Sequence, residues 1–174
     1  MTTRRSFLKT SGLAAIAGPV LADKSPPQPA ILSPSHRKVL TLVGEAMLPG
    51  SANAGLVTFL DKQLALDASD SLLMIRYLGV PAPYKNFYLA ALDGIVDWVK
   101  TEYDSDIEQL DSSQLSALVN DLASNRAGSF GPVPSGFFYF VLRADALDVV
   151  YGTRAGFDRL NMPYMAHIEP GTDW

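Results

Sequence analysis

The stretch Tyr84–Tyr103, YKNFYLAALDGIVDWVKTEY, carries the clearest periodic pattern in the chain. The apolar residues at four-residue spacing are Phe87, Ala91, Ile95 and Val99, and Tyr88, Leu92 and Val96 lie beside them. Residues four apart share one face of an α-helix, because the helix has about 3.6 residues per turn. The stretch therefore predicts a long amphipathic helix with one buried face, and we expect it to be the longest in the protein.

Helical patterns also precede this stretch. Ser33-Pro34 suits the N-cap and first turn of a helix that stops at Pro49-Gly50. A second helix is expected over Ala54–Leu66. A short third one, capped by Asp70, is expected to end at Gly79.

Two more helices are expected after it. Asp111–Gln114 has the capping-box pattern ahead of one helix. Another is expected over Gly136–Gly152, although its first part, Phe137–Leu142, also suits a buried strand. The segment Thr153–Trp174 has no sustained period and is expected to be an ordered but irregular tail. Apolar and polar residues alternate, as in a β-strand, only over a few residues at a time. We therefore predict an all-α chain with a single compact helical domain of about six helices.

The first residues have the pattern of a cleaved export signal. Arg4 and Arg5 are followed by Phe7-Leu8-Lys9 and by the apolar run Thr10–Leu21. This run is too short to span a membrane, which takes roughly 20 apolar residues. Small residues close it, so we expect cleavage after Ala22. An ordinary secretory leader is the alternative, but the paired arginines favour the twin-arginine route and a periplasmic location.

The chain thus divides into three segments: residues 1–22 form the signal peptide, residues 23–35 a Pro-rich linker, and residues 36–174 the helical domain. Cleavage would remove the basic residues Arg4, Arg5 and Lys9 and no acidic residue. The formal net charge would therefore change from −4 to −7. Such an acidic chain repels nucleic acid and anionic lipid, so we exclude both as direct partners. The chain has no cysteine, which excludes disulfides, iron–sulfur clusters and covalently attached haem.

Residues suited to catalysis or metal binding are few. The two histidines, His36 and His167, lie at opposite ends of the sequence, and neither is in a zinc-binding motif. We expect His36 on the surface and His167 satisfied by hydrogen bonds. Asp93 and Asp97 lie one helical turn apart and could pair as catalytic carboxylates, but this spacing is typical of a solvated helix face. Motifs of phosphate loops, dinucleotide folds and hydrolase nucleophiles do not occur. We therefore predict no catalytic residue and no metal site.

Apolar side chains, in contrast, are in surplus, at 48% of the sequence. Four aromatic residues are consecutive at 137–140, and because a helix turns about 100° per residue they would cover all its sides. Either a partner covers part of that helix, or the helix is central in its own domain. Spacing leaves open whether Arg143 forms a buried ion pair or contacts a partner. The expected partner interface consists of Phe137, Phe138, Tyr139, Phe140, Arg143, Tyr151, Tyr164, His167 and Trp174.

Three features together resemble one known family. They are the first helix closing in Gly44–Gly50 (GEAMLPG), the helix Gly136–Gly152, and the tail with its proline and tryptophan, all behind a twin-arginine leader. They resemble the small subunit (subunit 3, or gamma) of gluconate 2-dehydrogenase and of related flavin-dependent sugar and polyol dehydrogenases. In many members the Tyr-Gly pair that closes this helix, here Tyr151-Gly152, is followed by Gly-Gly-Asn. In this chain it is followed by Thr153–Arg159.

The resemblance implies an accessory subunit that is not an enzyme by itself and binds no cofactor. Its partner would be a large flavoprotein of the glucose–methanol–choline type that carries FAD, with a possible cytochrome c subunit carrying haem c. The small subunit would provide the signal read by the twin-arginine translocase and would reach the membrane only through its partners. Two alternatives stay open: a freestanding exported enzyme using Asp145, Asp148 and His167, or a module whose aromatic residues line a small-ligand pocket.

Overall fold

The computed structural model describes residues 30–163. Several predicted residues lie outside this range and stay predictions: Arg4, Arg5, Phe7, Leu8, Lys9, Ala22, Tyr164, His167 and Trp174. The described elements are α1 (Pro34–Met47), α2 (Leu56–Ala65), η1 (Met74–Leu78), α3 (Lys85–Tyr103), η2 (Ile107–Gln109), α4 (Ser112–Ala123), β1 (Ser129–Phe130), β2 (Val133–Pro134), α5 (Ser135–Tyr151) and α6 (Arg154–Arg159). The mostly helical prediction is confirmed, and α3 is the longest helix.

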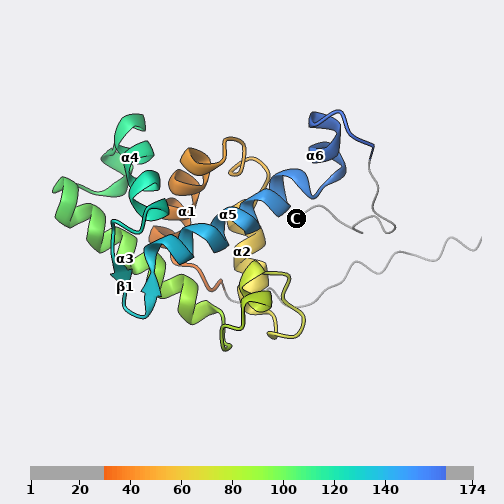
Figure 1. Cartoon of the computed structure of the whole chain (residues 1–174), viewed down its shortest axis with the longest axis horizontal. Coiled ribbons are helices and arrows are strands. Elements are labelled where there is room, and N and C mark those ends of the chain that lie inside the picture. The colour runs from red at the N-terminus through yellow and green to blue at the C-terminus, as the bar shows by residue number, and fades with distance from the viewer. Residues whose placement is uncertain (1–29, 164–174) are drawn as a thin grey trace, which may run out of the picture.

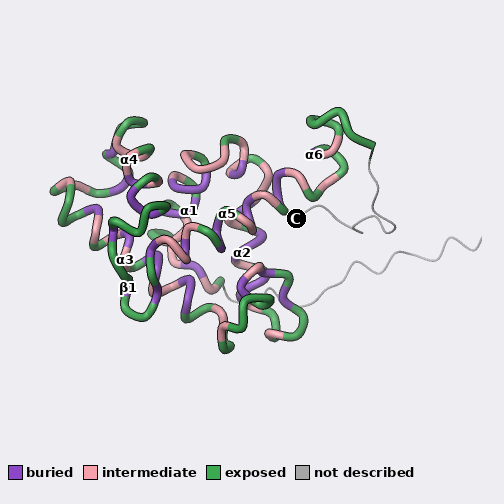
Figure 2. The backbone as a smooth tube through the Cα atoms, in the orientation of Figure 1, coloured by how far each residue is buried: buried purple, intermediate pink, exposed green. Residues whose placement is uncertain are grey.

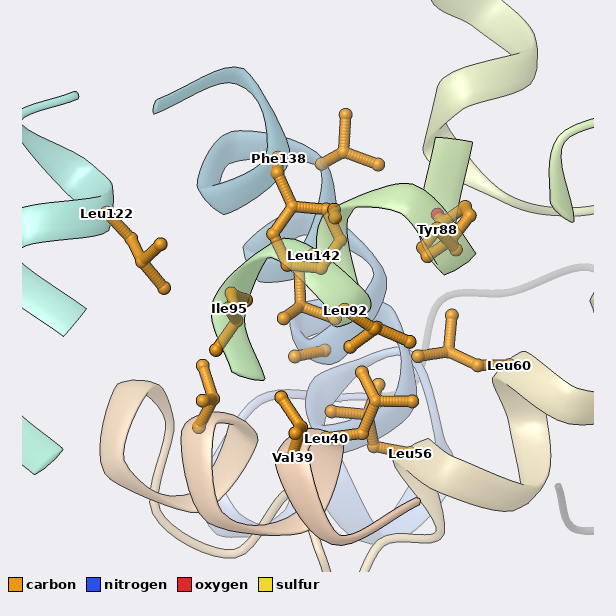
Figure 3. Close-up of a cluster of buried hydrophobic side chains, with 14 of the residues drawn as sticks. Val39, Leu40, Leu56, Leu60, Tyr88, Leu92, Ile95, Leu122, Phe138 and Leu142 are labelled. Atoms are coloured by element: carbon orange, nitrogen blue, oxygen red, sulfur yellow. The ribbon is translucent and has the colours of Figure 1, made fainter. Parts of the chain in front are cut away.

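The helices pack around α5, which crosses the front of the molecule from the β-hairpin to α6 (Figure 1). α1 packs against α2, α3 and α4, and α5 contacts all four of them. Side chains from these five helices meet in one hydrophobic core (Figure 3). Its labelled members are Val39, Leu40, Leu56, Leu60, Tyr88, Leu92, Ile95, Leu122, Phe138 and Leu142. No helix within residues 30–163 has the length and apolarity that crossing a membrane requires.

The start of α1 is fixed by its cap. Ser33 is the N-cap and Pro34 the first helical residue, as predicted, and the Ser33 side chain accepts a hydrogen bond from the His36 backbone N–H. His36 is less exposed than expected, because its side chain is only 12% exposed. Its Nδ1 lies 3.4 Å from the Ser33 backbone N–H, and its Nε2 lies 2.7 Å from Asp93 Oδ1 on α3. His36 therefore completes the cap and joins α1 to α3.

The short helix after α2 differs from the expectation. Asp70 does not cap it; the element is the 3₁₀ helix η1, which follows Leu73 and has no side-chain cap of its own. The Met74 backbone N–H at its start donates instead to Asp145 Oδ1 on α5, at 2.8 Å. A partner 71 residues away in sequence thus determines where η1 begins.

Apart from the short 3₁₀ helix η2, two further elements were not expected from the sequence. The first is the hairpin β1–β2, in which Phe130 pairs with Val133 across a turn containing Gly131 at φ +59°. The second is α6, whose N-cap Thr153 accepts a hydrogen bond from the Gly156 N–H, so part of the expected irregular tail is helical. α2 begins at Leu56, later than expected, because Gly55 before it has the left-handed φ of +90°.

Candidate partner-binding surface

The N-terminus of α5 is held by a side chain from the preceding turn. Asn125, in the turn after α4, has a positive φ of 58°. Its Oδ1 accepts hydrogen bonds from the Gly136 backbone N–H at 3.0 Å and from the Ser135 hydroxyl at 3.2 Å. Side-chain acceptors of this kind satisfy N–H groups that the first turn of a helix leaves without partners. α5 therefore starts at a fixed position relative to α4.

The inner face of α5 is part of the core. Phe138 is 0% exposed, and its ring lies 6.0 Å from that of Phe87 and 6.2 Å from that of Tyr88, between ring centroids. Spacings of 4.5–7 Å are typical of favourable aromatic contacts. The assignment of Phe138 to a partner interface is therefore corrected: it offers no surface, and its ring stabilises the fold.

Asp145 is also on the inner face and is 0% exposed. Its Oδ1 accepts from the Met74 N–H at 2.8 Å, and its Oδ2 accepts from the Tyr88 hydroxyl. Burial raises the pKa of the Asp145 carboxyl from 3.8 to about 7, and the nearby Asp148 charge adds to this, while the two hydrogen bonds act in the opposite direction. Both oxygens have partners in the core, so Asp145 joins three elements and does not reach a substrate.

The outer face of α5 carries a row of apolar side chains that we call the α5 stripe. It consists of Phe137, Phe140, Ala144, Leu147 and Tyr151, which alternate spacings of three and four residues and so follow one side of the helix. Phe140 is 52% exposed, and the other four are partly exposed. Figure 2 shows buried and more exposed stretches alternating along α5. α5 is central in its own domain, and within residues 30–163 one apolar face of it stays partly exposed. That a partner covers this face stays a prediction.

The predicted interface residues separate into groups on this helix. Phe137 and Tyr139 are partly buried and pack against the core, and the Phe137 ring lies 5.5 Å from that of Phe87. Arg143 is exposed at the edge of the α5 stripe, and no ion pair in residues 30–163 includes it. The structure thus brings Phe137, Phe140, Arg143 and Tyr151 to one side of α5 and places Arg143 on the surface.

The two alternative functions would need a cluster of catalytic side chains or an aromatic pocket. Asp93 contacts His36 rather than Asp97, and within residues 30–163 no three His, Asp or Glu side chains gather as a metal site would require. A pocket of about 320 Å³ lies between the end of α2 and the start of α3. Its only aromatic lining residue is Tyr84, and α5 contributes nothing to it. This is not the aromatic pocket on which the ligand-binding alternative depends.

Sequence reasoning missed a second exposed apolar group around η1. Its members are Leu66, Leu72, Tyr77 and Leu78, with Tyr77 the most exposed at 68%. The sequence predicts a short helix here, capped by Asp70 and ending at Gly79. Because the segment forms a 3₁₀ helix instead, its side chains lie at different angles and several of them face solvent.

Within residues 30–163, fold and surface define a small, mostly helical protein with the buried carboxyl of Asp145 at its centre and a partly exposed apolar face on α5. The family model for gluconate 2-dehydrogenase subunit 3 matches residues 34–171, from the first residue of α1 through all described elements. The chain belongs to the gluconate 2-dehydrogenase subunit 3 family, and the resemblance drawn from the sequence is confirmed. Searches among curated proteins and among solved structures found no match.

Proposed function

We propose that this chain is the non-catalytic small subunit of an exported FAD-dependent dehydrogenase complex acting on gluconate, a sugar or another alcohol. In this role it binds the large flavoprotein subunit and supplies the export signal for both. The family match over residues 34–171 carries the proposal, because the family is that of a dehydrogenase subunit. FAD belongs to the large subunit in this proposal, and haem c to a possible third subunit.

The α5 stripe supports the binding role. Phe140 is 52% exposed beside the partly exposed Phe137, and an aromatic pair at a surface is typical of the anchors that dominate protein–protein affinity. Arg143 adds a cation at the edge of the stripe, and Arg is enriched at such interfaces. The large subunit is expected to cover these three residues.

The leader supports the export role. Arg4 and Arg5, with Phe7-Leu8-Lys9 behind them, are typical of the twin-arginine route, which transports folded proteins. A flavoprotein that binds its cofactor before export has to cross the membrane folded. If it has no leader of its own, it needs a tightly bound partner that has one. The complex would then be periplasmic and would contact the membrane only through its other subunits.

The proposal is tested by changing Arg4→Lys and Arg5→Lys together in the source organism and assaying both subunits in the periplasmic fraction. We expect both subunits to be retained in the cytoplasm, because the twin-arginine translocase reads the arginines and not merely their charge. Lys62→Arg, an exposed change outside the leader, is the control and should leave export unchanged. Full export of the flavoprotein without the small subunit would refute the carrier role.

A pull-down of the native chain, followed by an absorbance spectrum of the eluate, tests the partners. Flavin bands would identify the large subunit, and haem bands would reveal a cytochrome. An eluate that contains this chain alone, with neither band, contradicts the proposed complex.

A further inference from the structure

The segment between α2 and α3 is held in place by buried polar side chains of the helices around it. Gln63 of α2 is 8% exposed, and its Oε1 accepts a hydrogen bond from the Leu72 backbone N–H at 2.7 Å. Asp145 of α5 holds the Met74 N–H in the same way. Between residues 66 and 84 the 3₁₀ helix η1 is the only regular element, so the segment depends on these side chains for its fixed shape.

Tyr77 is the most exposed large apolar side chain of this segment, at 68%. The Arg76 guanidinium lies 5.7 Å from the centroid of the Tyr77 ring, which is within cation–π range. Arg76 is fixed in turn, because its Nη1 donates to the Ser71 carbonyl at 2.9 Å. The Tyr77 ring is therefore held in place while it faces solvent. An exposed aromatic side chain that is already ordered loses little entropy when a partner covers it.

A pocket of about 320 Å³ lies beside this segment, between the end of α2 and the start of α3. These two helix ends lie below α5 in the view of Figure 1. Leu66 belongs both to the pocket wall and to the exposed apolar group of Leu66, Leu72, Tyr77 and Leu78. The pocket and the apolar group are thus continuous, and we call them together the η1 surface.

The pocket has polar groups that a ligand could satisfy. Asp67 is the only charged residue in its lining, and within residues 30–163 its carboxylate takes part in no ion pair. With Oε1 of Gln63 bound to the Leu72 N–H, the NH₂ half of this amide is left to donate. The pocket therefore suits a cation on an apolar stem that also carries a hydrogen-bond acceptor. Its other lining residues are Leu64, Leu66, Ala68, Ala82, Pro83 and Tyr84.

An arginine residue of another protein has all three features. Its guanidinium pairs with a carboxylate and stacks on an aromatic ring, here those of Asp67 and Tyr84. Its methylene stem packs on apolar walls, and its backbone carbonyl can accept from the Gln63 amide. A lysine would pair with the carboxylate but has no planar group to stack on the ring. The volume is at the lower end of the roughly 300–1,000 Å³ of ligand pockets, which is compatible with a single large side chain.

The surroundings of the pocket favour a protein rather than a free cation as its occupant. A small molecule in the pocket would leave Leu72, Tyr77 and Leu78 in water, at exposures of 46%, 68% and 37%. Exposed apolar groups rimmed by polar residues mark protein interfaces, in which arginine and aromatic residues are enriched. The cover that fits is therefore a protein surface with apolar side chains around one arginine.

The η1 surface lies near the part of the α5 stripe that we assign to the large subunit. The Phe137 ring lies 5.5 Å from the Phe87 ring, and Phe87 follows Tyr84 of the pocket by about one turn of α3. One large protein seated on Phe137 and Phe140 would therefore also reach the pocket.

We propose that the η1 surface is a second docking site for the large subunit of the dehydrogenase complex, and that an arginine of that subunit enters the pocket and pairs with Asp67. The identity of this partner rests on the proposed function, whereas the cation is inferred from the pocket itself. The interface then has two anchors on this chain: Phe140 on α5 and Asp67 in the pocket.

A matched pair of substitutions tests this site. Asp67→Asn and Asp70→Asn each remove one negative charge and keep nearly the same volume, but only Asp67 lines the pocket. The complex is isolated from its source through a tagged small subunit and is diluted in steps. The flavin absorbance that stays with the chain gives the dissociation constant, and urea unfolding checks that each variant folds as the wild type does.

We expect Asp67→Asn to raise the dissociation constant at least roughly tenfold, because the arginine of the large subunit loses its counter-charge. Asp70→Asn should change it by less than about twofold, as is typical of an exposed charge outside an interface. Tyr77→Ala, on the same surface but outside the pocket, should also raise it at least roughly tenfold.

Equal dissociation constants for the two Asn variants, with flavin still bound, would overturn this site and leave the proposed complex intact. A Tyr77→Ala complex as tight as the wild type would overturn the docking surface around the pocket. A wild-type eluate without flavin would overturn both this site and the proposed function. Loss of a second copy of this chain, instead of flavin, from the Asp67→Asn eluate would also overturn the inference, since the chain would then be its own partner.

Discussion

The Tyr88 hydroxyl on α3 donates a hydrogen bond to Asp145 Oδ2 on α5, and both side chains are 0% exposed. Burial raises the pKa of Tyr88 well above its ordinary value of 10, and the neighbouring Asp145 charge adds to this, so the phenol keeps its proton and remains a donor. The other Asp145 oxygen holds the Met74 N–H at the start of η1. One carboxyl thus sets α3, η1 and α5 relative to one another.

Replacing Asp145 by Asn should remove a pH dependence of stability. The raised pKa, about 7 against 3.8, means that the folded chain holds this proton more tightly than the unfolded chain. Below about pH 4 both states are protonated, and between about pH 4 and pH 7 the unfolded state ionises first, so the free energy of unfolding falls as pH rises. Between about pH 4 and pH 8, we expect the free energy of unfolding of the wild type to fall by up to roughly 4 kcal/mol relative to that of Asp145→Asn. Urea unfolding of both proteins at several pH values measures the two free energies. A difference between them that stays constant from about pH 4 to about pH 8 would contradict the prediction.

The Tyr88 hydroxyl itself can be tested with a matched pair of variants. Tyr88→Phe keeps the buried ring but leaves Asp145 Oδ2 without this donor, and an unsatisfied buried acceptor costs about 1–3 kcal/mol. Tyr77→Phe removes a hydroxyl from a ring that is 68% exposed and should change stability by less than about 0.5 kcal/mol. Denaturant unfolding at neutral pH compares the two. Equal effects would mean that the buried hydrogen bond contributes nothing specific.

Local patterns were enough to predict the amphipathic helices. α3 and α4 each have a periodic apolar face. The N-cap Ser33 and the capping box at Asp111 fix where α1 and α4 begin. These signals lie within a few residues of the feature they determine, so they can be recognised in the sequence alone.

The remaining features depend on contacts between distant residues. η1 starts where it does because of Asp145, and the hairpin has two residues in each strand, too few to show an alternating pattern. The four consecutive aromatic residues of α5 cover all its sides, so its sequence could not show that Phe138 points inward and Phe140 outward. Only the packing of the other helices against it decides which face stays exposed.

Phe138 and Phe140 should therefore respond differently to truncation. Phe138→Ala leaves a cavity between Phe87 and Tyr88 and should lower the free energy of unfolding by about 3–5 kcal/mol. Phe140→Ala should change stability by less than about 1 kcal/mol. It should weaken co-purification with the large subunit by roughly 2 kcal/mol, about 30-fold in affinity, if Phe140 is an anchor of the proposed interface. Thermal unfolding and a pull-down of each variant separate the two effects. Unchanged pull-down by a folded Phe140→Ala protein would remove this residue from the interface.

Gly94 on α3 lies under the ring of Phe130 in β1. A Cβ at this position would lie 2.4 Å from the Phe130 ring carbon Cγ, and the ring is 6% exposed, with little room to move. Gly94→Ala should therefore lower the free energy of unfolding by about 1–3 kcal/mol through overpacking, although Ala is the better helix former by about 1 kcal/mol. In a Phe130→Ala background the clash is absent, so the same change should raise stability by about 0.5–1 kcal/mol. Urea unfolding of the four proteins completes the double-mutant cycle. A stabilising Gly94→Ala in both backgrounds would show that the hairpin does not pack on α3 at this glycine.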